Sequence, residues 1–118
     1  NAKVGVFGLT FKENCPDLRN TKVPDLINHL LSFGCDINVT DSYADQKEAK
    51  KTYKLKLAEK NNINKCDVII MAVAHEDYKK MNINEWKKLF NKNGVFIDVK
   101  GIFSKEFFSG TNIVYWRL

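Results

Sequence analysis

The feature that most constrains the fold is the run Asp67–Val73, an almost unbroken series of apolar and mainly β-branched residues. A strand with one wet face would alternate apolar and polar residues, so this run is typical of a strand buried on both faces. Lys3–Phe7 and Val95–Val99 have the same character. Because such strands alternate with amphipathic helices, the sequence predicts an α/β fold. Right-handed crossovers then give a Rossmann-like three-layer αβα sandwich with a mainly parallel sheet.

The segments between these strands carry clear helix and strand signals. From Val23 to Phe33 apolar residues recur at helical spacing, Pro24 suits the first turn, and Gly34 is a typical stop signal. The segment 54–58 is compatible with a short edge strand or with irregular structure. We expect the remaining elements as a strand at 36–40, a polar helix at 45–53, a helix at 84–91 ended by Gly94, and a strand at 113–116.

Length and charge limit the class of protein. A chain of 118 residues is one domain by length. Asn1-Ala2 resembles the remnant of a cleaved tag, so we expect the native segment, part of a longer protein, to start at Lys3. The sequence has no signal peptide and no apolar run near the roughly 20 residues of a membrane span, so we expect no membrane partner. The net charge is +5, but most lysines lie between Lys47 and Lys92 without interleaved aromatic residues, which argues against a nucleic-acid partner.

The cysteines indicate the compartment. Cys15, Cys35 and Cys66 are odd in number, far apart, and remote in sequence from both histidines. This pattern argues against a disulfide framework or a zinc site and indicates a reducing cytoplasm. Cys15 could be a nucleophile only with a base beside it, and the sequence supplies none. A small side chain in the turn before Pro16 is the favoured interpretation.

The long loop between the first strand and the first helix is the strongest candidate for a functional site. Such loops lie at the carboxyl edge of a parallel sheet, where ligands bind. Phe11 offers a flat apolar face, Lys12 a mobile positive charge, and Arg19 a planar fork that can bridge two phosphate oxygens. Each has a simpler interpretation: a core residue, a solvated side chain, and a surface ion pair with Asp17 or Glu13. Their joint position on one loop nevertheless predicts a flat, anionic ligand.

A dinucleotide site is the obvious comparison for such a loop. Asp41 ends the second strand, where a ribose-binding acid would lie. However, the Gly-x-Gly-x-x-Gly pattern is absent, and about a dozen residues separate Gly8 from the helix whose N-terminus should meet the pyrophosphate. Gly5 is explained by close packing inside the strand, and Asp41 with Ser42 by a turn or a helix N-cap. The residues therefore disfavour NAD binding by this domain alone.

The loop from Gly8 to Thr21 closely resembles that of the C-terminal domain of the UDP-glucose/GDP-mannose dehydrogenase family. Its Asn-Cys-Pro-Asp-Leu-Arg-Asn segment is similar to the bacterial branch that oxidises UDP-N-acetylhexosamines for capsular, Vi-type or O-antigen polysaccharide. The resemblance covers the chain after Asn1-Ala2. Further matching blocks follow in the same order, at Asp41–Asp45, Ala72–His75, Asp98–Gly101 and Tyr115–Leu118.

The resemblance implies that residues 3–118 are the UDP-sugar-binding domain of an NAD-dependent enzyme. Such enzymes oxidise the sugar C6 hydroxyl to a carboxylate in two hydride transfers, through a cysteine-bound intermediate. It also implies an upstream NAD-binding domain, a helical dimerisation domain, and a full-length protein that forms a homodimer or higher oligomer. The catalytic cysteine belongs to an upstream Gly-rich motif, so Cys15 is not its equivalent. The chain alone should be inactive.

The resemblance also assigns roles to individual residues. Phe11 and Lys12 contact the UDP-sugar, with Phe11 near the nucleotide and Lys12 at the diphosphate side. Lys100 takes the position of a basic residue, often arginine, that meets the nucleotide, but it lacks the bidentate fork. Arg19 corresponds to an arginine that reaches the NAD held by another domain. His75 lies in a matching block without a known catalytic role, so we interpret it as a partly buried histidine bonded to nearby backbone.

Two other hypotheses are compatible with the sequence. One is a non-catalytic nucleotide-binding or interaction module that kept the fold without its enzyme partners. The other is a stand-alone dinucleotide-binding protein, which NAD-induced thermal stabilisation would support.

Overall fold

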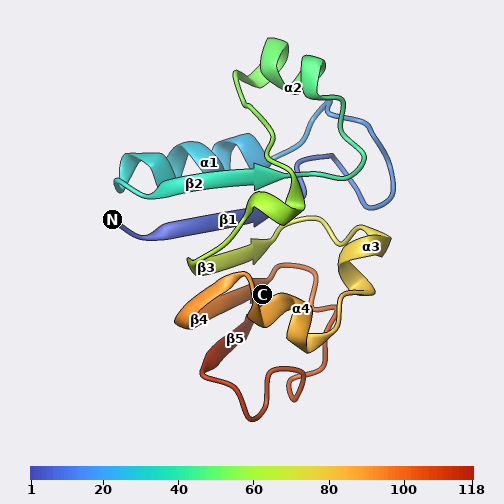
Figure 1. The fold of residues 1–118 in the computed structure, drawn as a ribbon. Helices are drawn as coiled ribbons and strands as arrows, with labels where there is room; N and C mark the ends of the chain where they lie inside the picture. The colour runs from blue at the N-terminus through green and yellow to red at the C-terminus, as the bar shows by residue number, and fades with distance from the viewer.

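The computed structural model describes residues 1–118, and they form one five-stranded sheet (Figure 1). All strand pairs are parallel, and the order across the sheet is β2-β1-β3-β4-β5. This confirms the predicted α/β fold with a parallel sheet. The strands are β1 (Lys3–Phe7), β2 (Asp36–Thr40), β3 (Cys66–Met71), β4 (Phe90–Asp98) and β5 (Ile113–Arg117).

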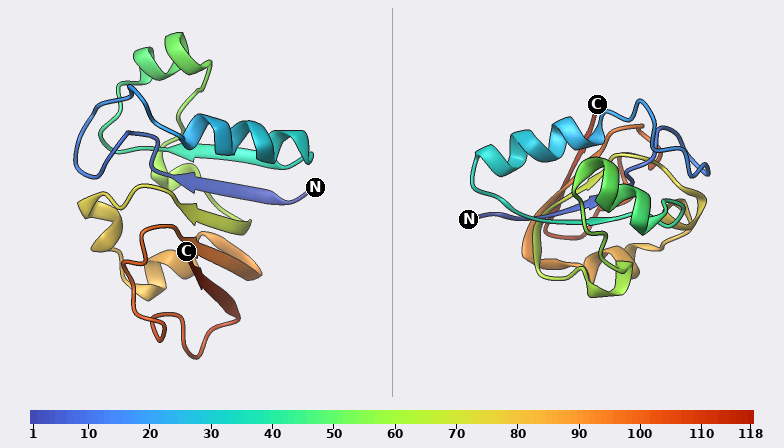
Figure 2. Two further views of the ribbon diagram at one scale, coloured as in Figure 1. Left: turned by 180° about the vertical axis from the view of Figure 1, so that it is seen from behind. Right: turned by 90° about the horizontal axis from the view of Figure 1, so that it is seen from above.

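Helices cover both faces of the sheet. One long helix lies on one face, and shorter turns of helix pack on the other (Figure 2). The long helix ends in a Gly34 turn with a φ of 80°, as the sequence predicted. The helices are α1 (Val23–Ser32) on the first face, and η1 (Lys60–Asn62), α3 (Glu76–Lys79) and α4 (Ile83–Lys87) on the second, with α2 (Gln46–Tyr53) beyond the β2 edge.

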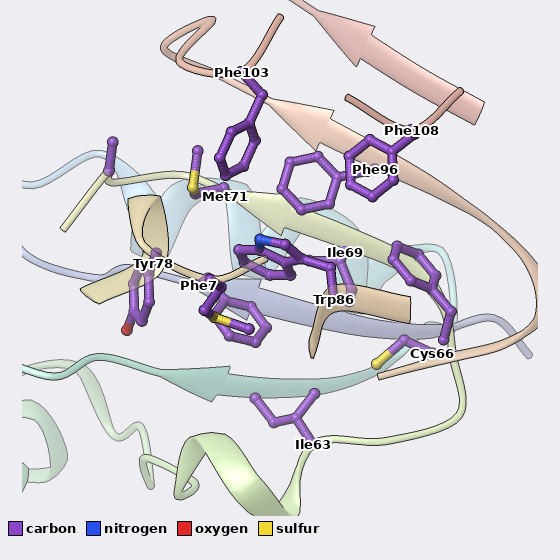
Figure 3. Close-up of a cluster of buried hydrophobic side chains, with 13 residues drawn as sticks. Phe7, Ile63, Cys66, Ile69, Met71, Tyr78, Trp86, Phe96, Phe103 and Phe108 are labelled. Carbon is purple, nitrogen blue, oxygen red and sulfur yellow. The ribbon is translucent and has the colours of Figure 1, made fainter. Parts of the chain in front are cut away.

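The central strands divide their side chains between two cores. On the α1 face, Val4 and Val6 pack with Ile27 in a cluster of aliphatic residues. On the opposite face, Phe7 contacts Trp86 of α4 edge to face, in a cluster rich in aromatic rings (Figure 3). Burial on both faces explains why these strands lack polar alternation.

Two sequence expectations need correction around Gly94. The expected helix at 84–91 is shorter: a capping box of Asn82 and Glu85 starts it at Ile83, and it ends at Lys87, three residues before β4 begins. Gly94 does not end the helix. It lies inside β4, where an added Cβ would fall 2.2 Å from a ring carbon of Phe90. The strand therefore begins at Phe90, five residues before the expected Val95, with a register shift against β3.

The segment 54–58 proved irregular, with a single bridge between Leu57 and Val39. The helix expected at 45–53 is present, with Asp45 as its N-cap: the Asp45 carboxylate accepts the Lys47 N–H at 2.8 Å. None of the helices is long and apolar enough to cross a membrane.

Candidate functional site

A cleft of about 550 Å³ opens on the α1 face, at the carboxyl edge of the sheet. Its floor is apolar and comes from the last residues of the central strands and the segments after them, including Ile70, Val73, Ile97 and Val99. Helix α1 lies toward the β2 side of this face, and no helix covers β4 or β5 there, so the floor stays open on that side (Figure 2). The arrangement provides a flat apolar surface at the sheet edge where ligands bind in α/β folds.

Two of the residues singled out in the sequence meet at this cleft. Phe11, 54% exposed, lies on one rim, and Lys100, which follows β4, lines the same cleft. They come together because only one strand, β3, lies between β1 and β4, so the segments that follow β1 and β4 leave the same edge of the sheet close to one another. Lys12 is exposed and is not among the lining residues, although its neighbours Thr10 and Phe11 are. Neither lysine has an ion-pair partner.

Arg19 forms a surface ion pair with Asp17, one of the two partners considered in the simpler interpretation of this residue. Its Nε donates to Asp17 Oδ1 at 3.1 Å, and a second guanidinium nitrogen donates to Oδ2 at 3.4 Å. The side-chain hydrogen bond from Arg19, followed by its backbone N–H, holds the pKa of Asp17 below its usual value. The Arg19 side chain remains 84% exposed, so the carboxylate orients the guanidinium without covering it.

The loop after β1 starts with a close approach to Val73, in the segment that follows β3. Gly8 adopts a φ of 101°, and an added Cβ would lie 2.5 Å from Val73 Cβ. Only glycine allows the chain to pass Val73 at this distance in this conformation. Further along the loop, the Leu18 carbonyl accepts a hydrogen bond from Tyr53 of α2. The glycine here therefore serves strand packing, and no turn of the dinucleotide type follows.

Asp41 and His75 form a pair beneath the loop. The sequence did not predict this pairing. Both side chains are fully buried, with Asp41 Oδ2 2.9 Å from His75 Nε2. Burial raises the pKa of Asp41, but hydrogen bonds from His75 and from the backbone of Leu9 and Tyr43 outweigh this, and the pKa is lowered. Because both carboxylate oxygens are occupied and covered, Asp41 has no oxygen free for a ribose hydroxyl. Asp41 is thus explained by its contacts within the fold and not by the role of a ribose-binding acid.

The turn that carries Lys100 is also held by a buried carboxylate. Asp98 Oδ2 accepts the Tyr115 hydroxyl at 2.6 Å and the Phe103 N–H at 2.9 Å. Burial, and then the hydrogen bond to the Asp98 carboxylate, raise the pKa of Tyr115 above its usual value, so this hydroxyl remains a donor. Gly101 makes the turn with a φ of 66°. These contacts fix where Lys100 enters the cleft.

All three cysteines are free, and burial raises the pKa of Cys66 to about 11. Cys15 is only half-buried and lies on the loop away from the floor of the cleft. No cysteine, histidine, aspartate or glutamate is among the residues that line the cleft.

Comparison with known proteins connects this geometry to a family. The family described as "UDP-glucose/GDP-mannose dehydrogenase family, UDP binding domain" matches residues 5–105, which include the loop, the cleft floor and Lys100. Protein CapL of Staphylococcus aureus is 42% identical over 117 residues, which are 99% of this chain and 27% of that protein. The UDP-N-acetyl-D-glucosamine 6-dehydrogenase of Pseudomonas aeruginosa is 36% identical over 105 residues, 89% of this chain and 25% of that protein.

A solved structure shares the fold. The NDP-N-acetyl-D-galactosaminuronic acid dehydrogenase of Methanosarcina mazei Go1 superposes with a TM-score of 0.86 at 22% identity, over 99% of this chain and 24% of that one. The chain thus spans about a quarter of the length of the relatives that it matches. From the match across residues 5–105, this chain belongs to the UDP-glucose/GDP-mannose dehydrogenase family, to its UDP binding domain.

Proposed function

We propose that the chain is the UDP-binding part of an NAD-dependent nucleotide-sugar 6-dehydrogenase. The full-length enzyme oxidises a UDP-N-acetylhexose to the uronic acid for surface polysaccharide, in the cytoplasm. The observation that carries the proposal is the match of the UDP binding domain to the segment that builds the cleft. The relatives' names, a UDP-N-acetyl-D-glucosamine 6-dehydrogenase among them, support an N-acetylhexosamine substrate. The free cysteines agree with a reducing compartment.

The chemistry of the cleft supports a nucleoside diphosphate as ligand. A uracil ring is flat and largely apolar on its faces, and Phe11 and the aliphatic floor offer matching surfaces. The diphosphate carries negative charge, and the ammonium groups of Lys12 and Lys100 have no carboxylate partner to neutralise them. We therefore assign Phe11, Lys12 and Lys100 to the substrate, with Lys12 reaching the diphosphate from the loop.

Arg19 has a separate role in this proposal. NAD, when bound, accepts hydride from the sugar C6, and we propose that the part of the protein outside this chain holds it. Arg19 then contacts NAD from the side, with Asp17 setting the direction of the guanidinium plane. What this chain contributes is binding and orientation: it holds the nucleotide so that the reacting carbon meets groups on the rest of the enzyme. We further propose that the full-length enzyme is a homodimer or a higher oligomer.

The test is steady-state kinetics on the full-length protein, with UDP-N-acetylglucosamine and NAD as substrates and NADH absorbance as the readout. Loss of a charged contact to phosphate in Lys12→Ala should raise KM for the UDP-sugar by about tenfold or more. Lys12→Arg keeps the charge and should recover most of the affinity. Lys51→Ala, which removes an exposed lysine of α2 remote from the cleft, is the matched control and should leave KM unchanged.

Two results would count against the proposal. A full-length protein that reduces no NAD with any UDP-hexose would contradict the enzyme assignment and favour a non-catalytic nucleotide-binding module. An active enzyme in which Lys12→Ala and Lys51→Ala behave alike would remove Lys12 from the substrate site.

A further inference from the structure

The buried pair of His75 and Asp41 has a defined proton arrangement. The Asn14 backbone N–H donates to His75 Nδ1 at 2.9 Å. Since a backbone amide can only donate, Nδ1 carries no proton, and the ring proton lies on Nε2. Nε2 then donates to Asp41 Oδ2 at 2.9 Å, with Thr10 Oγ1 3.2 Å away. The imidazole is therefore neutral, and both of its nitrogens are used.

Asp41 gathers backbone N–H groups from two loops. Its Oδ2 accepts from Leu9 at 2.6 Å and from Thr10 at 3.1 Å, both in the loop after β1. Its Oδ1 accepts from Tyr43 at 2.8 Å and Ala44 at 2.9 Å, in the loop after β2. One buried carboxylate thus connects the ends of two neighbouring strands.

These bonds enclose the residues proposed to bind the substrate. Leu9 and Thr10 stand immediately before Phe11 and Lys12, and Asn14 stands after them. We call this segment, residues 9–14, the arch. Within it, Thr10 Oγ1 donates to the Lys12 carbonyl at 3.0 Å. On the far side, Asn14 Oδ1 accepts the Glu76 N–H at 2.7 Å, which fastens the arch to the start of α3. Asn14 itself has a φ of 57°, a conformation that needs such support in a non-glycine residue.

We propose that His75 and Asp41 are positioning residues for the UDP-sugar: they fix both ends of the arch 9–14, so that Phe11 and Lys12 face the ligand before it binds. The proposal rests on the function proposed above and deepens it. Asp41 holds the entry to the arch, and His75 holds its exit through Asn14. A binding loop that is already ordered loses less conformational entropy when the ligand arrives, so the pair acts on affinity without touching substrate.

Two conservative variants separate the two bonds of the imidazole. The amide oxygen of asparagine lies near the position of Nδ1, so His75→Asn can still accept the Asn14 N–H, although it loses the donor to Asp41. The amide nitrogen of glutamine lies near Nε2, so His75→Gln keeps the donor to Asp41 and loses the acceptor for Asn14. Phe108→Leu weakens the aromatic core on the opposite face and is the control for general loss of stability.

The experiment has two readouts on the full-length protein. In steady-state kinetics, His75→Gln should raise KM for UDP-N-acetylglucosamine by about tenfold with little change in kcat, while His75→Asn stays within about threefold of wild type. In amide hydrogen exchange without ligand, His75→Gln should speed exchange across residues 11–14 and leave β1 protected. Phe108→Leu should change neither KM nor the exchange of this arch.

Unaltered exchange at 11–14 in His75→Gln would overturn the proposal, as would a KM change that all three variants share. A fall in kcat at unchanged KM would also overturn it, since that pattern assigns His75 to the chemical step. If the wild type oxidises no UDP-sugar, the proposed function fails, and the exchange measurement alone decides whether His75 fastens the arch.

Discussion

Gly8→Ala should be strongly destabilising, because two separate costs meet at this residue. The φ of 101° is a conformation that an L residue adopts only with strain, about 1–3 kcal/mol. In addition, the new Cβ would lie 2.5 Å from Val73 Cβ and 2.6 Å from the Val73 backbone nitrogen. Backbone cannot rotate away as a side-chain tip can, so overpacking adds about 1–3 kcal/mol. The total of about 2–6 kcal/mol is a large share of the roughly 5–15 kcal/mol stability of a typical domain.

The chain contains its own control for this prediction. Gly110 has a φ of 79°, and a Cβ added there would meet nothing within 4 Å. Gly110→Ala therefore carries the conformational cost alone, about 1–2 kcal/mol. The difference between the two variants isolates the close crossing over Val73.

The assay is urea denaturation of the 118-residue chain, followed by far-UV circular dichroism. With an m-value of about 1–3 kcal/mol/M, the overpacking cost of Gly8→Ala should lower its midpoint by roughly 0.3–3 M beyond that of Gly110→Ala. Equal midpoints for the two variants would contradict this prediction, since the approach of the loop to Val73 would then impose no steric cost at Gly8.

Three further predictions concern Tyr115, Asp41 and Arg19. Tyr115→Phe removes one of the two donors to the buried Asp98 carboxylate and should cost about 1–3 kcal/mol, measurable as a lower melting temperature, whereas an unchanged melting temperature would contradict the role given to this bond. The folded pKa of Asp41 lies below its ordinary 3.8, so its contribution to stability is full above that value and is lost as the pH falls through the lower, folded pKa. The difference in free energy of unfolding between wild type and Asp41→Asn, measured by urea denaturation, should become smaller below pH 3.8. A difference that grows there would contradict the lowered pKa of Asp41. In the full-length enzyme, Arg19→Ala should raise KM for NAD more than KM for the UDP-sugar, and the opposite order would reassign Arg19.

Much of the fold was predictable because burial on both faces leaves a direct mark on sequence. β1 and β3 show no polar alternation, and both were predicted within two residues of their observed ends. β4 was harder, because Asn91 and Asn93 are exposed and Gly94 resembles a helix stop. Gly94 belongs to a strand because it pairs with Ile113 of β5, a partner that lies 19 residues further along the chain and that no local pattern indicates.

The candidate site was predictable in part. The resemblance named Phe11 and Lys100, and the strand order explains how residues so far apart reach one cleft. For Arg19, local reasoning was sufficient, since the ion pair with Asp17 needs only two residues of separation. Spacing did not reveal that Leu118, the last residue, also lines the cleft.

The pairing of Asp41 with His75 could not be predicted from the sequence. Asp41 looked like a turn former, and it does accept N–H groups in its own turn. His75 looked like a histidine bonded to nearby backbone, yet its backbone partner, Asn14, is 61 residues away. The two side chains meet because β2 and β3 flank β1, which local patterns do not encode.

The central claim is that the UDP part of the substrate binds in the cleft beside Phe11, Lys12 and Lys100. Hydrogen exchange of the full-length protein with and without UDP-N-acetylglucosamine tests it most directly, once calorimetry has established that the ligand is bound. We expect bound ligand to slow exchange at residues 10–13 and 99–101 and to leave exchange across α2 unchanged. Bound ligand that leaves both of these segments unprotected would contradict it.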